Sequence, residues 1–396
     1  MRNMEKYRPD CMKFGAFIAP YHALSENHTM TLERDMKLVQ LMEELDFDEA
    51  WIGEHHSAGF EAIASPEVFI AAVAERTRRI RLGTGVSSLS YHHPLILADR
   101  MVQLDHQTRG RIMFGAGPGQ LPSDAIMMGI DPRKQRDMMS ASLECIVDLF
   151  EGKVVTRDEG WFRLCDARLQ TLPYQRRMEV AVACAVTPSG PVTAGRLGAS
   201  MLSVAASSGE GFASLPDHWR ICEEVARENG RQVHRDTWRV VAPIHIAETR
   251  EQAFAEVSQG IIPNVLDYMR KMGAQLECFN GIETGADATR SWSENTWMTF
   301  GTLTCGTPDD VANRIEAMLD QSGGFGTFLL LAHNAANWEA TQRSHELFSR
   351  YVMPRFQNRD RRTQSLQWIS DNRGQLFGSV MQATQQAMEK HRERLA

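Results

Sequence analysis

The chain has 396 residues, 23% of them charged, and a formal net charge of −7. This length suits one large α/β barrel or two ordinary domains. The absence of any long run of lysine or arginine argues against a protein that binds nucleic acid through a basic face, so a small-molecule partner is expected.

The seven cysteines are odd in number, scattered along the chain and never arranged as Cys-x-x-Cys. The sequence therefore predicts neither a disulfide framework nor a zinc site, and a reducing cytoplasm fits this pattern. No apolar run approaches the roughly 18 residues of a membrane span, and the polar segment 1–10 lacks a signal-peptide core. We expect a cytoplasmic protein with no membrane partner.

Apolar segments of strand character alternate with segments of helical periodicity along most of the chain. The predicted strands are 13–19, 48–54, 80–86, 111–117, 179–186, 200–206, 237–247 and 325–332. The principal predicted helices are 31–45, one from Ser65, 95–106, 136–150, 216–229, one from about 249, 307–321 and 338–351. Eight strands, each followed by a helix, indicate an α/β fold of the (β/α)8 TIM-barrel class. A doubly wound open sheet with a second domain is less favoured, because no change of composition marks a boundary.

Two helix starts carry local capping patterns. Ser65-Pro66-Glu67 combines an N-cap residue, a proline at the first helical position and an acid in the first turn. Thr307-Pro-Asp-Asp310 predicts another capped start, with Asp310 at the capping-box position.

The predicted organisation is an N-terminal tail, 1–12, a barrel with insertions, 13–356, and a C-terminal helical tail, 357–396. The periodic pattern dissolves within 260–304. A stretch of this length favours an active-site lid over a disordered insertion. The C-terminal tail is helical from about residue 375 and is expected to pack on another subunit, in a homodimer or a larger homo-oligomer.

Polar residues stand where the second and third predicted strands end. Glu54 ends the second strand and is followed by His55 and His56, and Thr84 and Gly85 lie near the end of the third. In a barrel the carboxyl ends of the strands share one rim, where active sites lie. His55 is therefore either a general acid–base residue, for which an imidazole is suited, or a structural histidine.

The fifth strand leads into Thr187-Pro188-Ser189-Gly190, which offers the best candidate anion site. A threonine that can cap, followed by small residues, leaves the N–H groups of the next helix free for a phosphate. The alternative is an ordinary helix start. Arg136, at the start of the helix after the fourth strand, is either a charge partner at the same corner or a solvated surface arginine.

Three glycines lie within the segment Gly115-Ala-Gly-Pro-Gly119, after the fourth strand. The third glycine of a Gly-x-Gly-x-x-Gly fingerprint is missing, because position 120 is Gln, so we reject a dinucleotide-binding interpretation. Gly117 and Gly119 instead allow the backbone to approach a flat ligand. A metal site is not expected, since adjacent histidines such as His55 and His56 point to opposite sides of a strand.

Several motifs in this order are similar to those of one family. They are Trp51-Ile-Gly-Glu-His-His56, Leu82-Gly-Thr-Gly-Val86, Tyr91-His-His-Pro94, Gly110-Arg-Ile-Met-Phe-Gly-Ala-Gly117 and Cys305-Gly-Thr-Pro-Asp309. Together they resemble the bacterial luciferase-like, flavin-dependent monooxygenases, and within that family the limonene monooxygenase and diketocamphane monooxygenase type. The resemblance covers residues 13–356.

The resemblance implies a TIM barrel that takes reduced FMN from a separate NAD(P)H-dependent flavin reductase. Such an enzyme reacts the flavin with O2 to a C4a-peroxyflavin and oxygenates a small apolar substrate such as a terpene or a cyclic ketone. The family's catalytic histidine corresponds to His55, which is preceded by Glu54. Its remaining cofactor-binding positions correspond to Thr84 and Gly85, where a non-proline cis peptide is common, and to Gly117, Gly119, Arg136, Thr187, Ser189 and Gly190.

The chain also departs from true luciferases, because Gly117-Pro118 replaces their Cys-Arg pair and Val186 replaces an acidic residue. Light emission from a long-chain aldehyde is therefore not expected. Three alternatives stay open: a deazaflavin-dependent oxidoreductase, an enzyme that cleaves flavin as its substrate, and a non-catalytic flavin-binding protein.

Overall fold

Eight parallel strands close into a barrel in the computed structural model, which describes residues 6–19, 21–260, 303–359 and 361–395 together with 271, 287, 290, 299 and 300. The barrel strands are β1 (Lys13–Ile18), β2 (Glu49–Ile52), β3 (Arg81–Thr84), β5 (Ile112–Gly117), β8 (Glu179–Cys184), β9 (Ser200–Ser203), β10 (Arg239–Ile246) and β13 (Thr327–Leu331). The ring closes because β13 pairs with both β10 and β1. This confirms the predicted (β/α)8 class.

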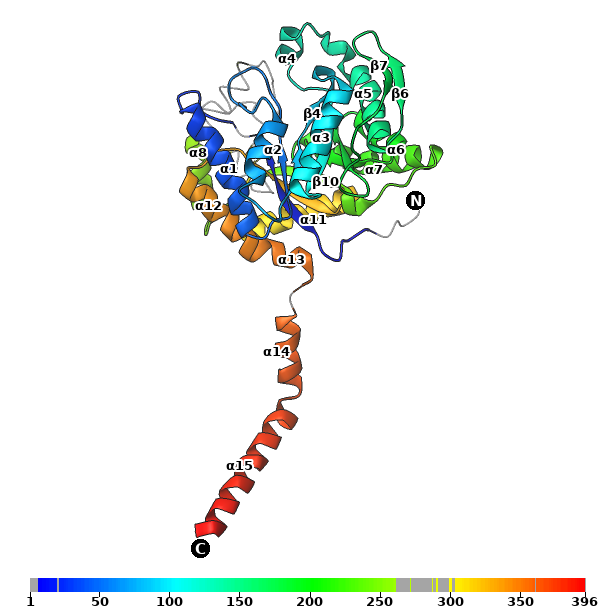
Figure 1. The fold of residues 1–396 in the computed structure, drawn as a ribbon. Helices are drawn as coiled ribbons and strands as arrows, with labels where there is room; N and C mark the ends of the chain where they lie inside the picture. Colours follow the sequence, from blue (N-terminus) through cyan, green and yellow to red (C-terminus); the bar gives the residue numbers. More distant parts are fainter. Residues whose placement is uncertain are drawn as a thin grey trace.

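Helices surround the barrel in Figure 1, as expected for parallel strands joined by crossover connections. They are α1 (His28–Glu44), α2 (Pro66–Ala74), α3 (Pro94–Thr108), α5 (Gln135–Phe150), α6 (Ser189–Leu197), α7 (Gly209–Glu228), α8 (Arg250–Gly260), α11 (Pro308–Ser322) and α12 (Trp338–Leu347). The Ser65 side chain caps α2. Thr307 and Asp310 form the predicted capping box of α11.

Smaller elements decorate the ends of the barrel. They are β4 (Ser87–Ser88), α4 (Pro122–Met127), α13 (Met353–Gln357), three single turns at Leu89–Tyr91, Pro132–Lys134 and Arg235–Thr237, and a π-helical turn at Phe348–Val352. Two antiparallel pairs also form, one between β6 (Val155–Asp158) and β7 (Arg163–Ala167) and one between β11 (Thr299–Phe300) and β12 (Leu303–Gly306). Strand β12 pairs in parallel with β10 outside the ring.

Strand and helix ends differ by a few residues from the sequence-based expectation, and three parts of the chain depart from it further. Helix α7 begins at Gly209, well before the predicted start at Pro216, because Ser208 caps it by accepting a hydrogen bond from the Gly211 N–H and the helix continues through the proline. The segment between α5 and β8, for which the sequence analysis predicts no strand, contains the β6–β7 hairpin. The C-terminal tail is helical from Arg362 rather than from about 375.

The C-terminal tail extends away from the barrel as α14 (Arg362–Asp371) and α15 (Arg373–Leu395) in Figure 1. Neither helix buries a residue, and Trp368 and Phe377 are exposed. Packing of this tail on another subunit stays a prediction. The predicted lid, 260–304, lies almost entirely outside the described residues.

The barrel has an inner and an outer apolar layer. One side chain from each of seven barrel strands forms the inner cluster, which consists of Phe17, Trp51, Met113, Ala181, Leu202, Val241 and Leu329. The outer layer packs between the strands and the helices. At the amino ends of the strands, Arg239 binds Glu49 (Nε to Oε2, 2.7 Å) and Glu179 (Nη2 to Oε1, 2.6 Å). These contacts fill the barrel and leave its opposite rim to carry the site.

In the part of the chain that the structure describes, no helix is both long enough and apolar enough to cross a membrane.

Candidate functional site

The sequence-predicted site residues gather at the carboxyl ends of the barrel strands. Glu54 and His55 follow β2, Gly85 follows β3, Gly117 ends β5, and Thr187 follows β8. This is the rim on which barrel enzymes carry their chemistry.

His55 lies between two carboxylates. Its Nε2 is 3.2 Å from Glu61 Oε2, and its Nδ1 is 3.4 Å from Asp124 Oδ2. The side chain is only 12% exposed. Burial lowers the pKa of His55, but the nearby carboxylates of Glu61 and then Asp124 outweigh it and raise the pKa to about 8. The imidazole is thus largely protonated at neutral pH.

Glu54 is the centre of a second polar cluster beside His55. Its Oε1 accepts hydrogen bonds from His56 Nε2 at 2.9 Å and from His92 Nε2 at 2.7 Å. Its Oε2 accepts from the Ser88 N–H at 2.6 Å. Burial raises the pKa of Glu54, but these hydrogen bonds hold it below its ordinary value. Glu54 is therefore an anion that ties the end of β2 to the loop after β3, and its contacts are made to protein groups.

The ends of β3 and β5 lie in close backbone contact. Thr84 is buried, and its hydroxyl donates a hydrogen bond to the Gly115 carbonyl. The Gly85–Val86 peptide bond is cis, as the resemblance implied. A Cβ on Gly117 would lie 2.3 Å from Val86 Cγ2. Gly119, with φ +92°, lies against the hydroxyl of Tyr91, where an added Cβ would be 2.4 Å away. Protein packing thus already requires Gly117 and Gly119.

The predicted anion site lies at the amino end of α6. Among the described residues no side chain caps this helix, whose N-cap residue is Pro188. The expectation that Thr187 caps it is wrong, because the Thr187 hydroxyl instead pairs with the Ser189 hydroxyl at 3.0 Å. Gly190 permits close packing on β8, since an added Cβ would lie 2.5 Å from the Ala183 carbonyl oxygen. An uncapped helix start with exposed hydroxyls fits a phosphate.

Arg136 stands near the start of the neighbouring helix α5 and is exposed. Helices α5 and α6 are tied together where Arg196 binds Glu144 at 2.7 Å and also donates to Ser140. Both helices follow the carboxyl end of a barrel strand, so their amino ends lie at the same end of the barrel. Arg136 is therefore placed on the same side as the α6 amino end, and its side chain is exposed.

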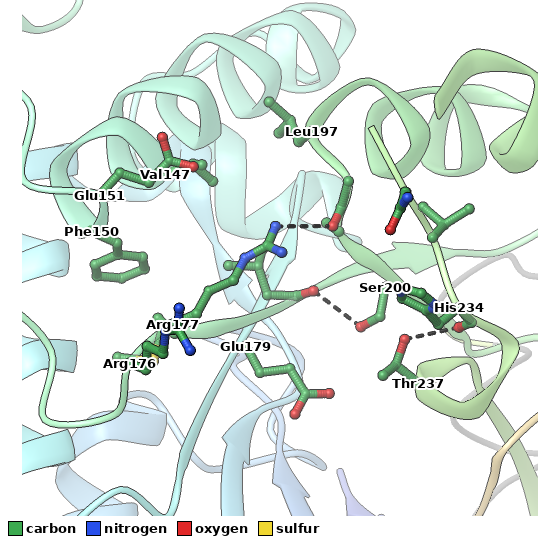
Figure 2. Close-up of a pocket in the computed structure, with 16 residues that line it drawn as sticks. Val147, Phe150, Glu151, Arg176, Arg177, Glu179, Leu197, Ser200, His234 and Thr237 are labelled. Atoms are coloured by element: carbon green, nitrogen blue, oxygen red, sulfur yellow. Dashed lines mark hydrogen bonds between the residues drawn. The ribbon is translucent and has the colours of Figure 1, made fainter. Parts of the chain in front are cut away.

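A cavity of about 320 Å³ lies at the opposite rim. Figure 2 shows residues that line this cavity, among them Arg176, Arg177, Glu179, Ser200 and His234. Glu179 and Ser200 are the first residues of β8 and β9, so the cavity opens at the amino ends of the strands. A much smaller cavity, lined by His55, Glu61 and Ile63 among others, marks the rim that carries the histidine. We place the candidate site at the rim of the smaller cavity, because His55 lies there between two carboxylates.

The described residues contain no group of three or more His, Cys, Asp or Glu side chains that could hold a metal ion.

A family model of luciferase-like monooxygenases matches residues 12–324. The chain belongs to the luciferase-like monooxygenase family. The two curated relatives described next are both named as monooxygenases.

Two curated relatives cover most of this luciferase-like monooxygenase. Limonene 1,2-monooxygenase of Rhodococcus erythropolis is 41% identical over 343 residues, which are 87% of this chain and 86% of the relative. 4-Hydroxyprotoasukamycin monooxygenase of Streptomyces nodosus subsp. asukaensis is 40% identical over 365 residues, 91% of this chain and 96% of the relative.

A solved structure with the same fold is the oxygenating constituent of 3,6-diketocamphane monooxygenase from Pseudomonas putida, in complex with FMN. Its TM-score is 0.72 at 23% identity, with coverage of 87% of this luciferase-like monooxygenase and 99% of that chain.

Sequence reasoning missed three partners in the site. Glu61 and Asp124 carry no motif of their own and reach His55 only through the fold. His92 was available from the Tyr91-His-His-Pro94 motif, but its contact with Glu54 joins residues 38 positions apart.

Proposed function

We propose that this chain is the oxygenating component of a two-component monooxygenase. It takes reduced FMN from a separate NAD(P)H-dependent reductase and uses O2 to oxygenate a small apolar substrate, such as a terpene or a cyclic ketone. The 41% identity with limonene 1,2-monooxygenase supports the substrate class. The fold shared with an FMN-bound Baeyer–Villiger monooxygenase supports the cofactor.

The observation that carries the proposal is that an uncapped helix start and a histidine between two carboxylates lie at one rim. The uncapped start of α6 supplies N–H donors for the FMN phosphate, with Thr187, Ser189 and Gly190 around it and Arg136 as a charge partner. His55 stands at the end of β2 on the same rim. The cofactor would span from one to the other, along the ends of β3 and β5.

Each group then has a definite task. Reduced FMN, when bound, supplies the electrons that activate O2. The backbone at Gly85, Gly117 and Gly119 would carry the flavin ring. Thr84 and Glu54 would support this backbone and not contact the flavin, since both are buried and hydrogen-bonded to protein groups. His55 holds a proton that it can donate to oxygen at the ring.

Product analysis tests the proposal. The full chain is supplied with a flavin reductase, NADH, FMN, labelled O2, and either a terpene such as limonene or a cyclic ketone. The expected product carries one labelled oxygen atom and forms only with FMN and O2. Anaerobic turnover with a deazaflavin alone would identify a hydride-transferring enzyme, and lumichrome among the products would identify flavin cleavage. Tight binding of oxidised FMN without any product would identify a flavin-binding protein.

A further inference from the structure

Both ring nitrogens of His55 face an acid, and the two acids come from different parts of the chain. Glu61 lies in the loop between β2 and α2 and approaches Nε2. Asp124 lies in α4, after β5, and approaches Nδ1. A neutral imidazole has a proton on only one nitrogen, so it could satisfy only one of these carboxylates.

Asp124 is held in place by Ser57 through one carboxylate oxygen and has its other oxygen near the histidine. Its side chain is 1% exposed, and its Oδ1 accepts a hydrogen bond from the Ser57 hydroxyl, which also contacts the Ser123 hydroxyl at 2.7 Å. Among the residues that the structure describes, its buried Oδ2 has no hydrogen-bond partner, and neither has His55 Nδ1, 3.4 Å away. A buried carboxylate oxygen without a donor is costly unless a cation faces it.

Glu61 is held by a loop that is fixed on both sides. The main-chain N–H of His55 donates to the Ile63 carbonyl at 3.1 Å, and the main-chain N–H of His22 donates to the Phe60 carbonyl at 2.9 Å. His22 is itself buried between Asp35, at 2.8 Å, and donors from Arg34 and Asn334. The position of Glu61 is therefore set by the scaffold and not by a free surface loop.

We propose that Glu61 and Asp124 are positioning residues that clamp the His55 ring between them with a proton on each nitrogen. The clamp fixes the orientation of the ring and makes His55 start the reaction as a proton donor. This inference rests on the proposed function only for its catalytic consequence, because the clamp itself exists without cofactor or substrate.

Other titratable groups near His55 do not compete for its protons. Glu54 directs both carboxylate oxygens to His56, His92 and Ser88. Tyr91 packs edge-on against His56 at 5.7 Å between ring centroids, and burial raises the pKa of its phenol to about 12. The remaining walls of the small cavity at His55 are apolar or backbone groups, among them Ile18, Gly53 and Ile63. Within the part of the chain that the structure describes, Glu61 and Asp124 are thus the two acids that determine the charge of His55.

Histidine side-chain NMR on the full chain without flavin tests the clamp. The His55 signal is assigned by its absence from a His55→Gln spectrum, and its titration midpoint is followed in the native chain, Glu61→Gln and Asp124→Asn. We expect a native midpoint near 8, and a downward shift of about one pH unit or more in each variant. Asp131→Asn is the matched control, because Asp131 lies in the same segment but binds Arg133 at the surface; its spectrum should keep the native midpoint.

The inference is overturned if native His55 titrates at or below about 6.5, or if both variants keep the native midpoint. Glu61→Gln covers the case in which Asp124→Asn fails to fold. The pH profile of kcat gives a second readout. Activity should fall as the pH rises through about 8, and this fall should move to lower pH in both variants. If the NMR titrations give the expected midpoints but no O2-dependent product forms, the proposed function is refuted and the clamp is not.

Discussion

The Thr84 hydroxyl donates a hydrogen bond to the Gly115 carbonyl at 2.8 Å and accepts one from the Gly115 N–H at 3.0 Å. Regular pairing of β3 with β5 covers Leu82 and Gly83, and pairing resumes only at Ser87 in β4. One side chain therefore replaces the missing backbone ladder. A Cβ on Gly115 would lie 1.9 Å from the Thr84 carbonyl oxygen, so this contact also requires glycine.

Thr84→Val should destabilise the protein by about 2–4 kcal/mol, because an isosteric apolar side chain leaves the buried N–H and C=O of Gly115 without partners. Urea unfolding measures the change. Thr84→Ser keeps the hydroxyl and is the matched control, with a smaller loss expected. Equal stability of the valine variant and the native chain would show that this bridge is not needed.

His55→Ala should lower substrate oxygenation by about 10²-fold or more, since general acid–base groups contribute at least that much. The assay supplies reduced FMN externally, so that reductase activity does not limit the rate. His234→Ala is the control, because His234 lines the cavity at the opposite rim, and its activity should match that of the native chain. Undiminished turnover in His55→Ala would remove this residue from the mechanism.

Glu54→Gln should destabilise the protein most between about pH 4.5 and 6.5. Burial lowers the pKa of His92, but its hydrogen bond to Glu54 raises the pKa above the ordinary 6.5. The resulting stabilisation is complete below 6.5 and is lost as the pH rises through the raised pKa. The pKa of Glu54 is held below the ordinary 4.5, so its contribution is lost as the pH falls through that lowered pKa.

Thermal unfolding of the native chain and of Glu54→Gln across this pH range tests the contribution of the Glu54–His92 pair to stability. The deficit of the variant should shrink at alkaline pH, where His92 is neutral in both proteins. A deficit that does not vary with pH would mean that packing, and not charge, is what Glu54 contributes.

Arg136→Ala should weaken FMN binding about tenfold, a value reduced from that of a buried charge pair because Arg136 is exposed. Quenching of flavin fluorescence measures the dissociation constant. Riboflavin, which lacks the phosphate, should bind the variant and the native chain equally. The control is Arg133→Ala, since Arg133 is exposed nearby but binds Asp131. An equal loss for FMN and riboflavin would place Arg136 away from the phosphate.

The sequence predicts the barrel well because its signals are local. Buried parallel strands are short apolar runs, so all eight appear in the sequence in the correct order. The Ser65 and Thr307 caps lie next to the helices that they start. The start of α7 was wrong because a proline is normally a helix boundary, whereas Pro216 lies inside this helix.

The contacts within the site were much harder to predict because they join distant parts of the chain. The Glu54–His92 contact spans 38 residues, and the His55–Asp124 contact brings together the ends of two different strands. A motif places His55 at the rim, but only the folded chain shows which acids face each nitrogen. The charge state of His55 follows from those acids.

A crystal structure of the chain with bound FMN tests the central claim most directly. The account predicts the phosphate within hydrogen-bonding distance of the main-chain N–H groups of Ser189 and Gly190, and the flavin ring beside His55. Flavin bound instead in the cavity lined by Arg176, Arg177 and Glu179, at the other end of the barrel, would contradict it.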